Sequence, residues 1–449
     1  MTGYKFISKG ILIMDKFFVG VAREDITPPL GTVLFGYPQK RLATEVHDGL
    51  NVTAFAFKSG DERLIMISAD ICVLEEDECD IIANEISAVT GIPADRVTFS
   101  ATHTHSGPTP KDLVGWDEKN VDYIVNILRP KSKKAALNAI SNMKEALMGV
   151  GTTNSLVGIN RRERSLDGKI LLGQNPWGVF NTEMTVLHFK STDGEIIGTM
   201  VNYGAHGTAA GDSTLITRDW PGAMCDTIEK KTNAIAAFFP GPTGDTGPRV
   251  SNGKTTGDIN DVEYLGKQAG EDALKALSSI TDFITPEIKF LVGEIRLPYK
   301  PLMPLEEAKS ALAALGDTQK LNGVSKNKAY KYSRVIEEYE SGRPIKESFS
   351  YKTVLISIGD IVFMTFPFEV FTEIPFRIAR VSPFKKTLAL NNTGGSLIYF
   401  PTKSEIVLGG YEVVMFEHFG IYSFGDDSDS YAVKGYLELL RKLNDIKNN

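Results

Sequence analysis

Residues 96–108 read Arg-Val-Thr-Phe-Ser-Ala-Thr-His-Thr-His-Ser-Gly-Pro, and this stretch decides how the rest of the chain is interpreted. Apolar and polar residues alternate up to Ala101, which predicts a strand over residues 96–104. His103 and His105 continue the alternation, so both imidazoles are expected on one buried face at the C-terminal end of the strand. A buried histidine pair needs polar partners, and two interpretations stay open. The pair either shares a metal ion or makes hydrogen bonds within the core.

Strand-like and helix-like patterns alternate outward from this stretch nearly to the end of the chain. Strands are expected over residues 52–57, 64–68, 185–190, 196–203, 234–239, 352–358 and 361–366. Helices are expected over residues 75–89, 120–146, 220–230, 262–277, 305–315, 327–340, 376–381 and 431–440. The alternation predicts an α/β fold, with mixed β-sheets flanked by helices on their outer faces, in a single large catalytic domain.

The domain is expected to span residues 17–449, preceded by an N-terminal extension over residues 1–16. Met14 is an alternative natural start, which would leave residues 1–13 outside the folded part. Residues 300–350 are rich in Lys, Glu and Ala and have little β propensity. They are predicted to form a peripheral helical insertion with a solvated face.

Composition excludes several classes of function. The chain has 449 residues, 49 basic against 56 acidic side chains and a formal charge of −7, which argues against nucleic-acid binding. No stretch approaches the roughly 20 apolar residues of a membrane span, so no transmembrane anchor is expected. Three cysteines without a CxxC pair favour a reducing compartment, and a cytoplasmic location is expected. The oligomeric state is left open.

Two further segments, one with a histidine and one rich in glycine, follow predicted strands. His206 lies where the strand over residues 196–203 runs into a Gly-rich loop, and a lone histidine there is more often structural than metal-ligating. The loop over residues 241–248 (Gly-Pro-Thr-Gly-Asp-Thr-Gly-Pro) lacks the spacing of a phosphate-binding loop. We expect it to be a tight turn that brings backbone amides close to a partner.

Other motifs accompany the histidine stretch in the same chain order, and together they resemble the catalytic N-terminal domain of the neutral/alkaline non-lysosomal ceramidases. The resemblance is carried by residues 19–28, 36–37, 68–70, 100–108, 159–161, 202–206, 244–245, 366–369, 399–402 and 410–412. It implies a zinc-dependent amidohydrolase that cleaves an N-acyl, ceramide-like amide bond with metal-activated water. The implied substrate is a small-molecule amide, with an N-acyl lipid as the candidate, which places the enzyme in sphingolipid metabolism.

The resemblance also assigns roles to individual residues. It implies Zn²⁺ ligands at His103, His206, Glu369 and Tyr399. It implies that the catalytic residues that line the pocket are His105, Arg161 and Tyr411. His105 is expected to carry the proton to the leaving amine, and the other two to donate hydrogen bonds to the developing oxyanion.

This chain departs from the family pattern at one catalytic position. Family members have a Gly-Asp-Val-Ser-Pro run, whereas Gly247 stands here at the serine position, and Thr246 is the nearest substitute hydroxyl. The family's C-terminal immunoglobulin-like domain is not expected within residues 17–449. Two alternatives therefore stay open: a zinc hydrolase of esters or lactones, and a non-catalytic relative that binds ligands in the same pocket.

Overall fold

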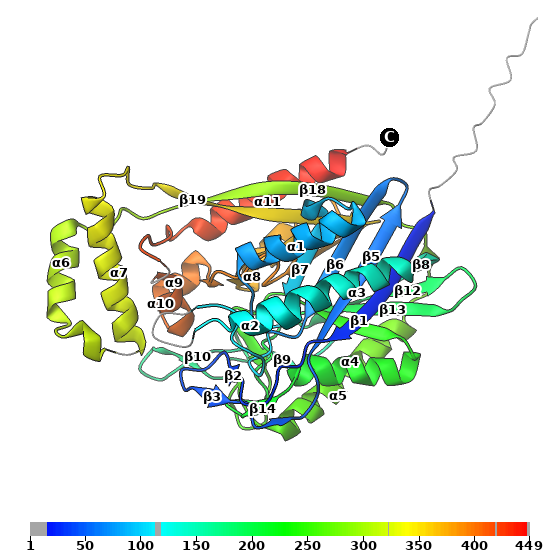
Figure 1. Ribbon diagram of the computed structural model, residues 1–449, viewed down its shortest axis with the longest axis horizontal. Coiled ribbons are helices and arrows are strands. Elements are labelled where there is room, and N and C mark those ends of the chain that lie inside the picture. The colour runs from blue at the N-terminus through cyan, green and yellow to red at the C-terminus, as the bar shows by residue number, and fades with distance from the viewer. Residues whose placement is uncertain (1–15, 113–117, 322, 418–419, 447–449) are drawn as a thin grey trace, which may run out of the picture.

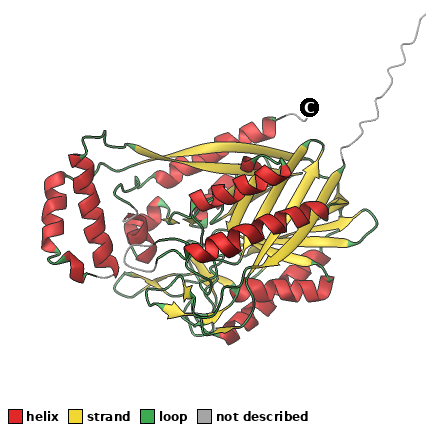
Figure 2. Ribbon diagram, in the orientation of Figure 1, coloured by secondary structure: helices red, strands yellow, loops and turns green. Residues whose placement is uncertain are grey.

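The computed structural model describes residues 16–112, 118–321, 323–417 and 420–446. Two β-sheets lie face to face in the middle of the molecule, and helices cover both outer faces (Figures 1 and 2). This arrangement confirms the predicted mixed α/β fold. The expected N-terminal extension lies, except for Lys16, outside the described residues.

The larger sheet has nine strands, in the order β15-β13-β12-β8-β1-β5-β6-β7 with β17 paired to β8. Its strands are β1 (Phe17–Asp25), β5 (Asn51–Ser59), β6 (Glu62–Ala69), β7 (Val97–Ala101), β8 (Lys144–Asn154), β12 (Glu183–Ser191), β13 (Ile196–Tyr203), β15 (Ile235–Pro240) and β17 (Phe283–Ile284). Two neighbouring pairs, β6 with β7 and β13 with β15, are parallel, and the other pairings are antiparallel.

The smaller sheet has the order β18-β19-β20-β22. Its strands are β18 (Ile288–Pro298), β19 (Ser348–Ile358), β20 (Ile361–Thr365) and β22 (Lys386–Leu390). Aromatic side chains of the larger sheet, among them Phe55 and Phe189, pack against Ile356 and Phe363 of the smaller one. Burial of this aromatic core between the sheets holds the two layers together.

Helices complete the outer layers. The opposite face of the larger sheet is covered by α1 (Glu76–Thr90), α3 (Arg129–Ser141), α4 (Asp219–Thr232) and α5 (Ile259–Ser278). The smaller sheet is covered by α8 (Glu373–Ala379) and α11 (Ser428–Asp445). The remaining helices are α2 (Val121–Tyr123), the π-turn Ile124–Leu128, α6 (Leu305–Ala314), α7 (Gly323–Glu340), α9 (Lys403–Leu408), α10 (Tyr411–Glu417) and two short 3₁₀ turns.

Short two-stranded ladders build the loops around the strand ends. They pair β2 (Val33–Leu34) with β3 (Arg41–Leu42), β4 (Glu45–Val46) with β14 (Leu215–Ile216), β9 (Gly158–Asn160) with β16 (Thr246–Pro248), β10 (Arg162–Arg164) with β11 (Ile170–Leu172), and β21 (Glu369–Val370) with β23 (Tyr399–Phe400). These ladders fix the loops that carry the functional side chains.

The expected helix over residues 120–146 is wrong at its C-terminal end. The helical part stops at Ser141, and Lys144 begins β8, which pairs with β12 from Ala146 to Asn154. The Lys-Glu-Ala-Leu-Met run has a high helix propensity, but pairing in the sheet outweighs it. The 11-residue strand β18 is likewise absent from the sequence prediction, because its apolar residues do not alternate cleanly.

Residues 300–350 contain α6 and α7, which contact each other and lie at the left of Figure 1, away from the sheets. Among the described residues, no helix combines the length and apolar character that crossing a bilayer requires. All three cysteines are buried and unpaired.

Candidate metal centre and pocket

The histidine pair lies just beyond β7 rather than on it. The strand ends at Ala101, and His103 has a left-handed backbone conformation with φ of 72°. The expected strand over residues 96–104 is therefore too long, and strict alternation does not orient the two rings. They still converge, because His103 Nε2 and His105 Nε2 lie 3.5 Å apart. A strained non-glycine backbone at this point is typical of a functional site.

His206 and Glu369 come from distant parts of the chain to the same point. His206 follows β13, and Glu369 begins β21 shortly after β20. The Glu369 Oε2 atom lies 3.0 Å from His206 Nε2 and 3.3 Å from His103 Nε2. All three side chains are at least 89% buried. A cluster of two imidazoles and one carboxylate is thus assembled between the ends of the two sheets.

Backbone carbonyls determine which ring nitrogens of the histidines are free. The Nδ1 atoms of His103, His105 and His206 lie 2.8, 3.1 and 3.1 Å from the carbonyl oxygens of Cys72, Gly36 and Thr246, respectively. A carbonyl can only accept, so each Nδ1 carries a proton, and a ring in its neutral form presents its Nε2 lone pair to the centre of the cluster. This is the arrangement that orients metal-ligating histidines in proteins.

The charges of the cluster depend on one another. Burial lowers the pKa of His103, but Glu369 and Cys72 together outweigh burial and raise it well above 6.5. The neighbouring histidines, against the effect of burial, hold the pKa of Glu369 well below 4.5. Burial, together with Arg161 and His103, lowers the pKa of His206 to about 3. The carboxylate therefore attracts positive charge into the space between the rings, whether a proton or a metal ion.

Two atoms of the cluster indicate that a metal fits here. The buried His206 Nε2 and Glu369 Oε2 atoms have no hydrogen-bond partner among the described residues. The ligand atoms of His103, His206 and Glu369 all lie within 4.8 Å of one another. Unpaired buried acceptors are costly, and a divalent cation would satisfy the ligand atoms of all three side chains. A second group of possible ligands, Cys72 with His103 and His105, meets the same distance criterion.

Tyr399 is held beside this cluster by a short parallel ladder. Glu369 and Tyr399 are directly paired between β21 and β23, and the Tyr399 ring stacks on His206 with centroids 6.3 Å apart. Tyr411, at the start of α10, meets the Tyr399 ring edge-on at 5.7 Å and is 40% exposed. The structure thus brings the predicted fourth ligand next to the other three, while its role in binding metal stays a prediction.

Arg161 lies behind Tyr399, with its guanidinium carbon 5.2 Å from the centre of the tyrosine ring. Its Nε atom donates to Glu412 Oε1 at 2.8 Å, whereas its buried Nη2 has no hydrogen-bond partner among the described residues. The other Glu412 oxygen accepts from Arg162 Nη1 at 2.8 Å, and Arg162 Nε donates to Glu405 at 2.6 Å. Arg162 was not singled out in the sequence, because a second arginine beside the first has no distinctive spacing.

The loop over residues 241–248 contacts two residues of the cluster through its backbone. Gly244 lies directly against the Glu369 carbonyl, and a Cβ at this position would collide with it. The Thr246 carbonyl accepts hydrogen bonds from the backbone N–H and the Nδ1 of His206. The loop thus contacts its partners through the backbone, but with a carbonyl as well as an amide: the Gly244 N–H donates to the Val370 carbonyl at 3.0 Å, and the Thr246 carbonyl accepts from His206.

Neither hydroxyl candidate of this loop borders the pocket. A Cβ at Gly247 would lie 2.6 Å from the Cβ of Thr255, so the place of a serine side chain is occupied. The Thr246 hydroxyl lies 3.2 Å from that of Thr372 and 3.4 Å from Asp245 Oδ1. It is engaged in the core and does not substitute for the missing serine.

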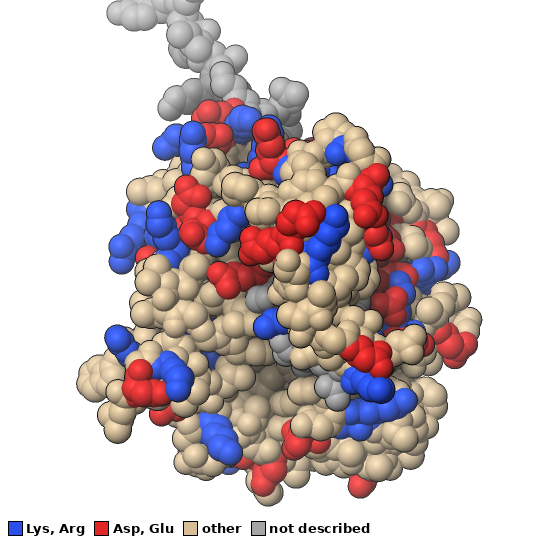
Figure 3. Space-filling view, turned by 90° about the vertical axis from the view of Figure 1, so that its left-hand side faces the viewer, with Lys and Arg blue, Asp and Glu red and all other residues tan. Residues whose placement is uncertain are grey.

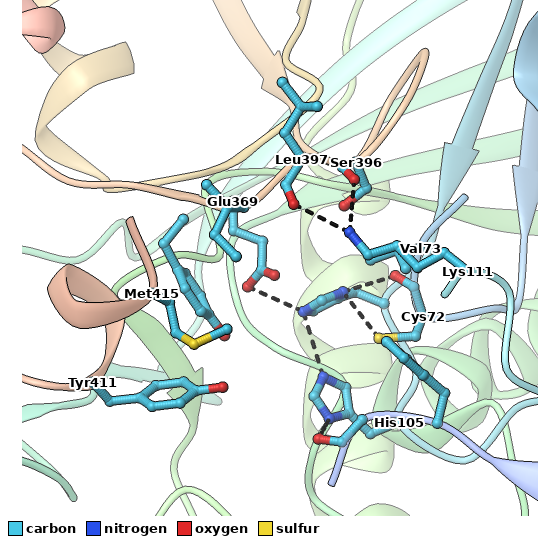
Figure 4. A pocket seen from close by; sticks show the side chains of 14 residues that line it. Cys72, Val73, His105, Lys111, Glu369, Ser396, Leu397, Tyr411 and Met415 are labelled. Carbon is cyan, nitrogen blue, oxygen red and sulfur yellow. Dashed lines mark hydrogen bonds and ion pairs between the residues drawn. The ribbon is translucent and has the colours of Figure 1, made fainter. Parts of the chain in front are cut away.

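The cluster opens to the surface through a pocket (Figure 4). The face at the left of Figure 1 is hollowed (Figure 3). The wall contains Phe35, Gly36, Cys72, Val73, His103, His105, Lys111, Glu369, Ser396, Leu397, Ile398, Tyr399, Tyr411 and Met415. Cys72 and Lys111 were not predicted from the sequence, since neither belongs to a motif with metal-ligand spacing.

Comparison with known proteins identifies a family and a shared fold. The family model described as neutral/alkaline non-lysosomal ceramidase, N-terminal, matches residues 17–269, more than half of the chain. Neutral ceramidase A of Dictyostelium discoideum is 26% identical over 285 residues, which cover 56% of this chain and 38% of the relative.

Two solved structures share the fold. Neutral ceramidase from Pseudomonas aeruginosa matches with a TM-score of 0.72 and 18% identity, over 96% of this chain and 75% of the other. A ceramidase complexed with C2 matches with the same TM-score and coverage at 16% identity. On the evidence of the family model, with the fold in agreement, this chain belongs to the neutral/alkaline non-lysosomal ceramidase family.

Proposed function

We propose that the protein is a zinc-dependent hydrolase that cleaves an amide bond of an N-acyl, ceramide-like substrate. The observation that carries the proposal is the convergence of His103 Nε2, His206 Nε2 and Glu369 Oε2, two of which are buried without a hydrogen-bond partner among the described residues. These three side chains would hold Zn²⁺, and Tyr399 would supply a fourth ligand. When bound, the ion polarises a carbonyl group and lowers the pKa of water.

The remaining residues have distinct tasks in this proposal. His105 has its Nδ1 fixed by the Gly36 carbonyl, so its Nε2 is free to take up a proton and pass it to the leaving amine. Burial and the neighbouring His103 lower its pKa well below 6.5, which keeps the ring neutral and able to accept. Tyr411 at the pocket wall and the unpartnered Nη2 of Arg161 are the donors for the developing oxyanion.

A serine nucleophile has no place in this scheme. Thr255 fills the space beside Gly247, and the Thr246 hydroxyl is engaged with Thr372. Hydrolysis is therefore proposed to proceed by direct attack of water, without a covalent acyl-enzyme at this position. The same machinery would also cleave an ester, which is the second candidate activity.

The test is product analysis with the zinc-loaded full chain. N-dodecanoyl sphingosine and a matched ester are supplied, and release of free amine and fatty acid in equal amounts is expected from the amide. In His105→Ala, kcat should fall by about 10²–10⁴-fold while zinc stays bound, because a general acid–base is lost but no ligand. Absence of amide cleavage, a trapped acyl adduct, or unchanged turnover in the variant would each overturn the proposal.

A further inference from the structure

Lys111 lies in the pocket wall and no motif accounts for it. It follows the histidine stretch, and its Nζ donates to the carbonyl oxygens of Ser396 and Leu397, both at 3.1 Å (Figure 4). An ammonium group has three N–H donors. Among the described residues these two carbonyls are its only hydrogen-bond partners, so one N–H stays available. Lys111 borders the same pocket as His103 and Glu369.

Several buried arginines in the molecule pair with a carboxylate, whereas Lys111 and Lys331 donate to neutral oxygens. Arg129 pairs with Glu78, Arg161 with Glu412, and Arg218 with two aspartates. Lys111 has no carboxylate within 4.0 Å among the described residues, although it is only partly exposed. Burial accordingly lowers its pKa from the usual 10.5. A buried ammonium without an anion is costly, and two neutral carbonyls offset only part of that cost.

The rest of the wall suits a hydrocarbon chain. Phe35, Val73, Leu397, Ile398 and Met415 supply an apolar lining. Lys111 and Tyr411 lie on opposite sides of the pocket view in Figure 4. A ligand with an apolar chain and one anionic group would therefore find partners for both parts in this pocket.

We propose that Lys111 forms an anion subsite, and that the pocket takes N-acyl amides whose polar part carries a carboxylate, such as an N-acyl amino acid. The proposal rests on the proposed amidohydrolase function and names the substrate class of the same site. The free N–H of Lys111 would donate to a carboxylate oxygen, a charge-assisted hydrogen bond that a neutral alcohol cannot match.

The test compares two ligands that differ in one group, N-dodecanoylglycine and N-dodecanoylethanolamine. Binding to the zinc-loaded full chain is measured by calorimetry, and hydrolysis is measured separately with the same compounds. The wild type should bind the carboxylate compound about tenfold to a hundredfold more tightly. Lys111→Met should remove this preference by weakening the carboxylate compound alone, and Lys111→Arg should retain part of it.

Lys331→Met is the matched control, because Lys331 Nζ also donates to a backbone carbonyl, that of Glu417, but does not border this pocket. It should leave both affinities unchanged. The inference would be overturned if the wild type bound the carboxylate compound no more tightly than the ethanolamide, or not at all. It would also be overturned if Lys111→Met weakened the binding of both ligands equally, because Lys111 would then have a purely structural role. A binding preference without any hydrolysis would instead contradict the proposed function and leave the anion subsite standing.

Discussion

Two buried polar clusters lie next to each other beneath the pocket, and they satisfy their polar atoms in opposite ways. In the first cluster, His103, His206 and Glu369 present acceptor atoms to one another. In the second, Glu412 lies between Arg161 and Arg162 and receives a hydrogen bond from each at 2.8 Å. Glu412 is 1% exposed and Glu369 8%, so burial alone does not distinguish them.

The difference shows how a ligand site can be told from a structural ion cluster. A carboxylate between two guanidinium groups is complete by itself and fixes the chain segments that carry it. A carboxylate between two bare imidazole nitrogens is incomplete until a cation joins it. Substitutions in the first cluster are therefore expected to change metal binding. Substitutions in the second cluster are expected to lower the free energy of unfolding. Two experiments test this contrast directly, and two more set it against buried positions outside both clusters.

The largest effect is expected from the loss of a ligand in the first cluster. His206→Ala should lose most of its zinc and at least about a thousandfold in activity, because the metal supplies several kcal/mol of transition-state stabilisation. Elemental analysis of the purified variant measures the zinc. His47→Ala, whose imidazole pairs with Glu263 elsewhere on the molecule, should keep the wild-type stoichiometry. Unchanged zinc in both His103→Ala and His206→Ala would refute the ligand assignment.

Glu412→Gln probes the second cluster. Removal of the buried charge leaves two guanidinium groups without their shared partner, and we expect unfolding to become easier by about 3–5 kcal/mol. Urea denaturation measures this change. The matched variant Glu405→Gln affects a carboxylate that is 32% exposed and pairs with Arg162, so its cost should be nearer 1 kcal/mol. Zinc loss from Glu412→Gln at unchanged stability would show that the two clusters do not differ as described.

A third buried histidine, outside both clusters, gives a smaller effect that depends on pH. Burial lowers the pKa of His188 to about 4, and its Nδ1 lies 2.9 Å from the Thr199 hydroxyl. The native state thus favours the neutral ring. The contribution of His188 to the free energy of unfolding is fully present above the unfolded-state pKa of about 6.5. It is lost as the pH falls through 4, and the total loss is at most about 3 kcal/mol. The difference in unfolding free energy between wild type and His188→Gln, measured with chelator from pH 7 to 4, should shrink accordingly; a constant difference contradicts the assignment.

The smallest effect concerns the position where the family has serine. Gly247→Ser should destabilise the protein by about 1–3 kcal/mol, because the new Cβ would overlap the Thr255 side chain. The double variant Gly247→Ser with Thr255→Ala should recover most of the lost stability. Thermal unfolding compares the two. A serine that is tolerated alone would mean that the region between Gly247 and Thr255 can adjust without cost.

Local sequence patterns predicted most of the longer elements but not their exact extent. Gly91, in the left-handed conformation, ends α1 where a glycine after a periodic segment is expected to end a helix. The hairpin of β12 and β13 turns at Asp193-Gly194, as its sequence indicates. The prediction failed for β8, where a helix-favouring sequence is recruited into the sheet by β12 on one side and β1 on the other.

Some features of the candidate site could likewise be predicted from the sequence, and others could not. His103 and His105 stand out in the sequence as an alternating pair at the end of a strand, whereas the sequence around His206 favoured a structural role. The resemblance to a family added His206, Glu369 and Tyr399 as ligands. No spacing in the chain predicts that β21 and β23 pair, which places Tyr399 beside Glu369. The carbonyl oxygens that fix the ring nitrogens also escape sequence patterns, because any residue type provides a carbonyl.

The sequence by itself determined the alternation of strands and helices, the histidine stretch and the absence of a hydroxyl at Gly247, all of which depend on residue type and short-range spacing. Only the tertiary structure decided that Thr255 fills the place of that hydroxyl, that Arg162 shares Glu412 with Arg161, and that Lys111 borders the pocket without a carboxylate partner among the described residues. These contacts join residues that are distant in the chain, and their energies depend on burial and distance in space. Neither quantity is encoded in any local window of the sequence.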